Sequence, residues 1–86
     1  MHKLGIKPSA EKDLDRLRGE TWQRVLDAIT ALLTQPRPSG YTKLKGPGGS
    51  FRIRIGDYRV IYDIDDGEQT VTVLRVKHRR DVYKDF

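Results

Sequence analysis

The sequence predicts an α+β fold in which two antiparallel helices cover one face of a small, mostly antiparallel sheet. The first observation is the stretch FRIRIGDYRVIY at residues 51–62, where apolar and basic residues alternate around a Gly-Asp pair, as in a β-hairpin. The others are two upstream segments with helical apolar spacing and the β-branched run TVTVLRV at residues 70–76. The expected order is β-α-α-β-β-β in one domain over residues 1–86, because a chain of this size holds a single core.

The N-terminal segment predicts a short strand followed by a helix. KLGIK at residues 3–7 alternates weakly and is ended by Pro8. A helix is expected near residues 9–18, with Ser9 as its N-cap and Gly19 as its stop. Its apolar residues recur at helical spacing: Ala10, Leu14 and Leu17.

The second helix is the clearest element of the sequence. Thr21 is a candidate cap, and Pro36 and Pro38 end the helix. One continuous apolar stripe runs along it, formed by Trp22, Val25, Leu26, Ile29, Leu32 and Leu33. Because Trp22 belongs to this stripe, we expect it to anchor the core and not to stack on a nucleic-acid base.

The hairpin is predicted to carry an apolar face and a basic face. A two-residue turn at Gly56-Asp57 pairs Ile55 with Tyr58, Ile53 with Val60 and Phe51 with Tyr62 on the core side. On the other side, Arg54 lies opposite Arg59 and Arg52 lies beside Ile61. Like charges that face each other across two strands are destabilising. We therefore expect an anion, most simply a phosphate, between the two arginines.

The remaining segments are less decisive. Residues 36–50 hold four glycines and three prolines and predict a loop, with a brief extended segment at residues 43–45. Asp66-Gly67 marks the turn before the last strand. In that strand Val71 and Val73 share one parity, whereas Leu74 and Val76 share the other. Either both faces of the strand are partly covered, or a β-bulge changes the register midway.

Composition narrows the class of partner. The net charge is +5 and the pI about 9.7. Residues 36–86 hold eleven Lys/Arg against seven Asp/Glu, and residues 1–35 hold six against five, so the excess lies on the hairpin half. A polyanionic partner fits this distribution.

Without cysteine, and with two histidines far apart in sequence, neither a metal nor another cofactor is expected. No long apolar segment suggests a membrane span, so we expect a cytoplasmic protein.

Several motifs in a fixed order resemble one known family. The helix opening PSAEKDLDRL, the loop ending KLKG, the paired FRIRIGDYRVIY and the close HRRDVY resemble the RelE/ParE toxin superfamily, and its RelE branch in particular. The resemblance implies the toxin of a type II toxin–antitoxin system, a hydrolase that cuts mRNA in the ribosomal A site and thereby inhibits translation. It also implies a cognate antitoxin bound in a heteromeric complex.

The same resemblance assigns roles to particular residues. Arg52 and Arg54 match a basic pair of the second strand, Arg59 matches an arginine at the start of the third, and Arg79 and Tyr83 match a basic and an aromatic residue after the last strand. His78 is a further candidate for the catalytic base. The remaining RNA-binding candidates are the basic residues Lys43, Lys45, Lys77 and Arg80.

Metal-free RNA cleavage uses the ribose 2′-hydroxyl to attack the adjacent phosphate, with a base, an acid and cations on the phosphoryl oxygens. Arginine stays charged, so Arg59 and Arg79 suit phosphate binding and charge stabilisation. His78 or Tyr83 would move protons, although Tyr83 could stack on a base or pack at the C-terminus, and His78 could be a polar residue at a strand end. This acid–base set is small, so we expect weak activity on free RNA and dependence on the ribosome for positioning.

Two other functions stay open. A ParE-like protein shares the fold and poisons DNA gyrase, but the resemblance predicts loss of the basic pair and of the terminal tyrosine in that branch. A binding-only RNA module would favour aromatic residues on the open face, whereas Phe51, Tyr58 and Tyr62 are predicted to face the core. We expect the antitoxin to block Arg59 or displace the segment from Arg79 to Tyr83, using exposed apolar neighbours such as Ile61.

Overall fold

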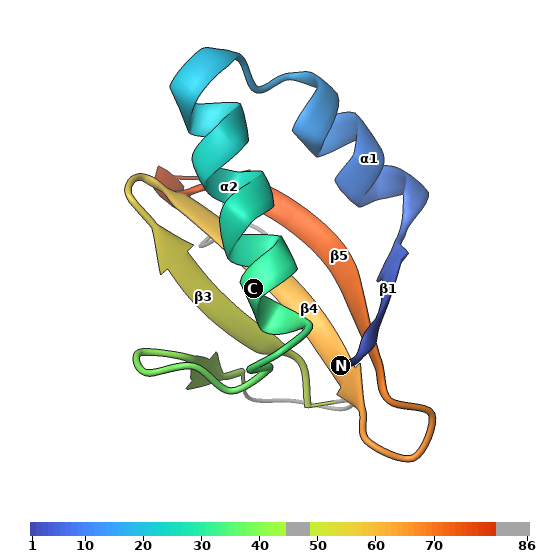
Figure 1. The fold of residues 1–86 in the computed structure, drawn as a ribbon. Coiled ribbons are helices and arrows are strands. Elements are labelled where there is room, and N and C mark those ends of the chain that lie inside the picture. The colour runs from blue at the N-terminus through green and yellow to red at the C-terminus, as the bar shows by residue number, and fades with distance from the viewer. Residues whose placement is uncertain (45–48, 81–86) are drawn as a thin grey trace.

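The computed structural model describes residues 1–44 and 49–80. The elements follow the predicted order, with one short additional strand, and form a five-stranded sheet in the order β1-β5-β4-β3-β2. Both helices lie over the same face of this sheet (Figure 1). The bounds are β1 Lys3–Ile6, α1 Pro8–Asp15, α2 Gly19–Leu32, β2 Thr42–Lys43, β3 Phe51–Ile55, β4 Tyr58–Asp65 and β5 Thr70–His78.

The sheet is mixed, because its first strand runs parallel to its last. β1 pairs with β5 in parallel, from Lys3 opposite Thr70 to Ile6 opposite Val73, and every other pairing is antiparallel. The α+β prediction of a mostly antiparallel sheet under two helices is confirmed. A parallel neighbour needs a long crossover, and the two helices supply it.

Both helices begin without the predicted side-chain caps. The N-cap of α1 is Lys7, with Pro8 at the first helical position, and the N-cap of α2 is Arg18. The cap predictions for Ser9 and Thr21 are therefore wrong. Pro8 presets the backbone of the first turn and lacks the N–H that a cap would satisfy. Ser9 instead donates its hydroxyl to the carbonyl of Leu74, 2.9 Å away.

The hairpin has the predicted register. Ile55 pairs with Tyr58, Ile53 with Val60, Phe51 with Tyr62, Arg54 with Arg59 and Arg52 with Ile61. Gly56 occupies the first turn position with φ of +58°. This conformation favours glycine and matches the twist of the two strands, as in a type II′ turn.

A register shift divides β5 into two halves. Tyr62 pairs with Val73, but the preceding Ile61 pairs with Arg75, so Leu74 is the extra residue of a β-bulge. The bulge explains how Val71, Val73 and Val76 can all be buried despite their parities. Of the two alternatives that the sequence left open, the bulge is the one observed.

The core lies between the helices and the sheet. It is formed by Ala10, Leu14, Leu17, Val25, Ile29, Leu32, Phe51, Ile53, Val60, Tyr62, Val71, Val73 and Val76. Trp22 is 41% exposed, so the prediction that it anchors the core is wrong. It lies at the edge of the α2 stripe, beside a shallow hollow bordered by Ile6, Leu14 and Leu26.

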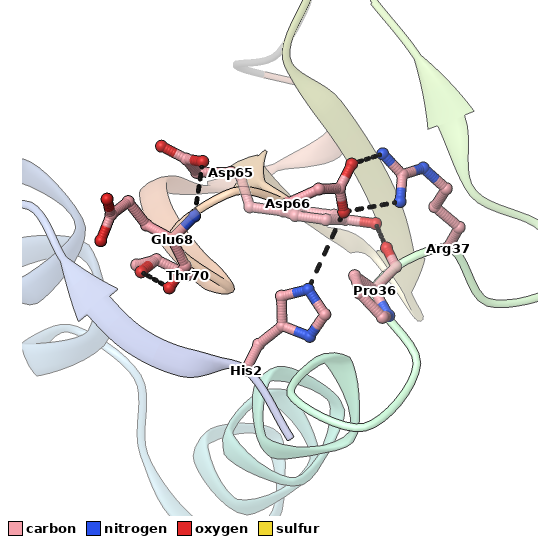
Figure 2. Close-up of polar contacts among 8 residues, drawn as sticks. His2, Pro36, Arg37, Asp65, Asp66, Glu68 and Thr70 are labelled. Carbon is pink, nitrogen blue, oxygen red and sulfur yellow. Dashed lines mark hydrogen bonds and ion pairs between the residues drawn. The ribbon is translucent and has the colours of Figure 1, made fainter.

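A polar cluster fastens the segment after α2 to the β4–β5 turn. Figure 2 shows Arg37 reaching both carboxylate oxygens of Asp66, at 3.0 and 3.3 Å, while His2 approaches the same carboxylate at 3.9 Å. The Tyr62 hydroxyl donates to the carbonyl of Pro36 at 2.7 Å. Burial raises the pKa of Tyr62 to about 12. The hydrogen bond to Arg37 lowers the pKa of Asp66.

Candidate functional site

Three cations lie in one row across the sheet. Arg59 on β4 is opposite Arg54 on β3 and also opposite Lys77 on β5. These residues have the parity opposite to Val60 and its partners, which face the helices, so the row lies on the other face of the sheet. Directly opposite Cβ atoms are about 5 Å apart, and like charges at that separation repel. The row therefore forms a site for an anion with several charged oxygens.

The next row on this face, formed by Arg52, Ile61 and Arg75, is not uniformly cationic. Arg52 and Arg75 flank Ile61 in register, but Arg75 pairs with Asp13 of α1, with Nε–Oδ2 at 2.8 Å. Ile61 is fully buried, so the expectation of an exposed apolar neighbour there is wrong. The aliphatic parts of long basic side chains readily cover such a residue. Arg52 thus extends the cationic surface next to Arg54, whereas Arg75 is engaged elsewhere.

Arg59 is held close to the hairpin turn. Its Nη1 donates to the carbonyl of Tyr58 at 3.1 Å and to that of Gly56 at 3.3 Å. Neutral carbonyls restrain the guanidinium without cancelling its charge. The central cation of the row is therefore partly preorganised for an anion.

Arg79 lies one step beyond the row, at the hairpin turn. Its backbone N–H donates to the carbonyl of Asp57 at 2.7 Å, and its Nε is 3.8 Å from the Asp57 carboxylate. Both side chains are more than half exposed. In this arrangement an acidic neighbour accompanies Arg79, whereas Lys77 is the cation that faces Arg59.

His78 lies apart from the row. It pairs with Tyr58, whose parity is that of the core, and the two rings meet edge to face with centroids 5.4 Å apart. Its Nδ1 accepts the backbone N–H of Arg80 at 3.3 Å. The structure therefore does not bring His78 together with the arginines that the sequence grouped with it.

The other predicted residues are dispersed. Lys43 is exposed on β2, beside the start of β3. Arg80 is exposed after β5. Lys45 and Tyr83 lie outside the described residues. Lys77 was expected only as a general RNA-binding residue, because its position opposite Arg59 depends on where the bulge falls, which the sequence does not reveal.

The arrangement can hold phosphate oxygens, but the described residues offer little acid–base chemistry beside it. Arg54, Arg59 and Lys77 supply charge and hydrogen-bond donors. Within residues 1–44 and 49–80, no group of three potential metal ligands lies together. No helix in this part of the chain is long and apolar enough to cross a membrane.

The chain matches a family of toxins over nearly its whole length. Residues 4–83 match the family model described as the ParE toxin of the type II toxin–antitoxin system parDE. This match spans nearly the whole chain, which therefore belongs to that family within the RelE/ParE superfamily.

Individual relatives point to the RelE branch, as the sequence motifs indicated. Over 77 residues the chain is 36% identical to Toxin RelG of Mycobacterium tuberculosis, covering 88% of each chain. It is 30% identical to Toxin RelE of the same organism over 82 residues, covering 94% of this chain and 84% of the relative.

Solved structures with similar folds include two toxin–antitoxin complexes. The complex RelBE2 of Mycobacterium tuberculosis matches with a TM-score of 0.79 at 30% identity, covering 91% of this chain and 98% of the other. The archaeal RelE–RelB complex of Pyrococcus horikoshii matches with a TM-score of 0.80, also at 30% identity, covering 91% and 94%. The predicted RelE-like fold is confirmed.

Proposed function

We propose that this protein is a cytoplasmic, metal-independent endoribonuclease toxin that cuts mRNA in the ribosomal A site and is neutralised by a cognate antitoxin. The observation that carries the proposal is the row of Arg54, Arg59 and Lys77 across three strands. Like charges that face one another across neighbouring strands repel. A bound RNA phosphate removes the repulsion and turns it into binding free energy.

Each member of the row has a role in the proposed reaction. The 2′-hydroxyl attacks the adjacent phosphate, the 5′-oxygen leaves, and negative charge builds on the phosphoryl oxygens between these steps. Arg59 stabilises this charge from the centre of the row, with Lys77 beside it. Arg52 and Arg54 hold the RNA backbone. Charge stabilisation of this kind is worth about 10²–10³ in rate per donor.

The shortage of proton-transfer groups beside the row, among the residues that the structure describes, supports dependence on the ribosome. His78 is on the helix side of the sheet, and guanidinium groups are poorly suited to proton transfer. Alignment of the 2′-hydroxyl with the phosphate must then contribute much of the rate. The ribosome, which holds mRNA in a fixed path, would supply that alignment. Tyr83 remains our candidate for proton transfer or base stacking.

The antitoxin is proposed to cover this surface. An apolar groove of about 520 Å³ adjoins Arg54, between α2 and β3; its lining includes Ala28, Ala31, Leu32, Ile53 and Ile55. An acidic segment with apolar side chains would fill this groove on the helix side and continue past Arg54, which borders the groove, to Arg59 on the other face of the sheet. The groove takes the place that the sequence analysis gave to Ile61. The complexes formed by the similar RelE proteins support such a partner.

Primer extension on mRNA programmed into 70S ribosomes tests the activity. Wild-type protein should cut within the A-site codon, Arg59→Ala should lose most cleavage, and saturating antitoxin should abolish it. Arg16→Ala is the matched control, because Arg16 is exposed on the helix side. Full cleavage by Arg59→Ala, or by toxin saturated with antitoxin, would contradict the proposal.

A second candidate is inhibition of DNA gyrase, favoured by the description of the matching family as ParE toxins. A supercoiling assay run beside the primer extension separates the two functions. Gyrase inhibition without mRNA cleavage would establish the second candidate in place of the first.

A further inference from the structure

The bulge at Leu74 decides which side chains of β5 join the cationic row. In a regular strand that continued from Val73, which faces the core, Leu74 and Val76 would face away from the helices and Lys77 would face them. The extra residue reverses this alternation. Val76 is consequently buried, and Lys77 lies opposite Arg59. A one-residue change in register would remove Lys77 from the site.

Asp13 of α1 is bonded to β5 immediately after this bulge. Its Oδ2 accepts the backbone N–H of Val76 at 2.9 Å and the Nε of Arg75 at 2.8 Å, and its Oδ1 accepts from Nη2 of Arg75 at 3.2 Å. Asp13 is only 8% exposed. A nearly buried carboxylate that accepts three hydrogen bonds holds the strand in one register. Each of these charge-assisted bonds would be distorted if β5 moved by one residue.

These bonds lie at the outer edge of β5. β1 covers that edge only as far as Val73. Beyond it, α1 takes over the role of a neighbouring strand: Ser9 donates to the carbonyl of Leu74 and Asp13 accepts from Val76. The edge groups on either side of Arg75 are thus both satisfied by α1.

We infer that Asp13 is a positioning residue, which fixes the bulge at Leu74 and thereby aims Lys77 at the phosphate held by Arg59. Asp13 lies on the helix side of the sheet and acts only through β5. The inference about position stands on the geometry alone, while its consequence for cleavage rests on the proposed function.

The register itself is tested by NMR. Val60 and Val76 are a non-hydrogen-bonded pair, whose Hα atoms approach closely and give a cross-strand NOE. Wild-type protein and the control Asp15→Ala, an exposed residue of α1, should show this NOE and slow exchange of the Val76 amide. Asp13→Ala should lose both, and Asp13→Asn, which keeps an acceptor oxygen, should retain them. An unchanged NOE and unchanged exchange in Asp13→Ala would overturn the inference.

The consequence for catalysis is tested by a double-mutant cycle with Lys77. Asp13→Ala should lower kcat by about 10²-fold with a smaller change in KM, since a misplacement of about 1 Å has an effect of this size. In a Lys77→Ala background the same substitution should have little further effect, because two residues that act through one contact are not additive. An equal fold-loss in both backgrounds would show that Asp13 does not act through Lys77. If wild-type protein cuts no mRNA, the proposed function fails, and the NMR result still decides whether Asp13 sets the register.

Discussion

At the scale of single residues, basic side chains that look equivalent in the sequence differ in the charged groups that lie next to them. Arg59 faces two other cations, Arg75 faces a buried carboxylate, and Arg79 faces the exposed carboxylate of Asp57. An incoming phosphate would offset the repulsion within the row of Arg54, Arg59 and Lys77. The functional value of a basic residue here is set by which charges it already faces.

This distinction predicts an order of effects on mRNA cleavage. Lys77→Ala should reduce kcat by on the order of 10²-fold, as for other donors to a developing oxyanion, and Arg79→Ala should have a smaller effect because Asp57 already offsets its charge. Single-turnover cleavage on programmed ribosomes measures both, with Arg16→Ala as the control. A larger loss in Arg79→Ala than in Lys77→Ala would refute this order.

Tyr62 predicts a defined dependence of stability on alkaline pH. Its folded pKa of about 12 lies above the ordinary value near 10, so the unfolded chain releases the phenolic proton first. The stabilisation is complete below about pH 10 and is lost as the pH rises toward 12, by about 2–3 kcal/mol in total.

Urea unfolding of wild-type protein and Tyr62→Phe across this range measures the effect. The variant should be about 1 kcal/mol less stable at neutral pH, because the Pro36 carbonyl loses its donor. Between pH 10 and pH 12 this advantage of the wild-type protein should disappear and then reverse, because the wild-type protein loses about 2–3 kcal/mol that the variant has no phenol to lose. A constant difference over the whole range would contradict the assignment.

At the scale of elements, the hairpin was predictable in detail and the last strand was not. Residues 51–62 carry both their alternation and their turn in sequence, so local rules fix the register of Arg54 and Arg59. The register of β5 depends on Asp13, which is 63 residues from Val76. No local pattern reveals such a partner, and the position of Lys77 was missed for this reason.

The predictions for the helix caps and for Trp22 were wrong for a related reason. Ser9 has the chemistry of a cap, but its hydroxyl finds the edge of β5. Trp22 fits the apolar stripe, but it borders an open hollow between α1 and α2, and the side chain stays 41% exposed. Periodicity identifies a face of a helix but not how far the neighbouring layer extends.

The turn at Gly56 should be sensitive to any side chain. Gly56→Ala places an L-residue at φ of +58°, which costs about 1–2 kcal/mol. Gly67→Ala is the control, because Gly67 is also in a turn but has no positive φ. Thermal unfolding of the two variants should show a lower Tm for Gly56→Ala. Equal Tm values would argue against a glycine-dependent turn.

At the scale of the whole molecule, the two faces of the sheet are divided between stability and function. The helix side holds the core cluster, and the opposite side holds the cationic row. This division could be predicted from the sequence because apolar and basic residues alternate along the hairpin at residues 51–62. The parallel pairing of β1 with β5 could not be predicted, since neither strand carries a signal for its neighbour.

The division predicts a salt dependence for binding of single-stranded RNA. Three phosphate contacts from Arg54, Arg59 and Lys77 should give a slope of about −2 in a plot of log K against log salt concentration. Each alanine substitution in the row should make the slope less steep by about 0.7, and Arg16→Ala should leave it unchanged. Fluorescence anisotropy with a short labelled RNA supplies the measurement; identical slopes for all variants would refute the assignment of the row.

The parallel pairing of β1 with β5 also has a consequence for the synthesis of the protein. Lys3 to Ile6 find their partners only at Thr70 to Val73, so the N-terminal strand has no place in the sheet until those residues have been translated. Lys77 completes the cationic row even later. A nascent chain therefore cannot assemble this surface until Lys77 has left the ribosome, and under the proposed function its activity arises only after that point.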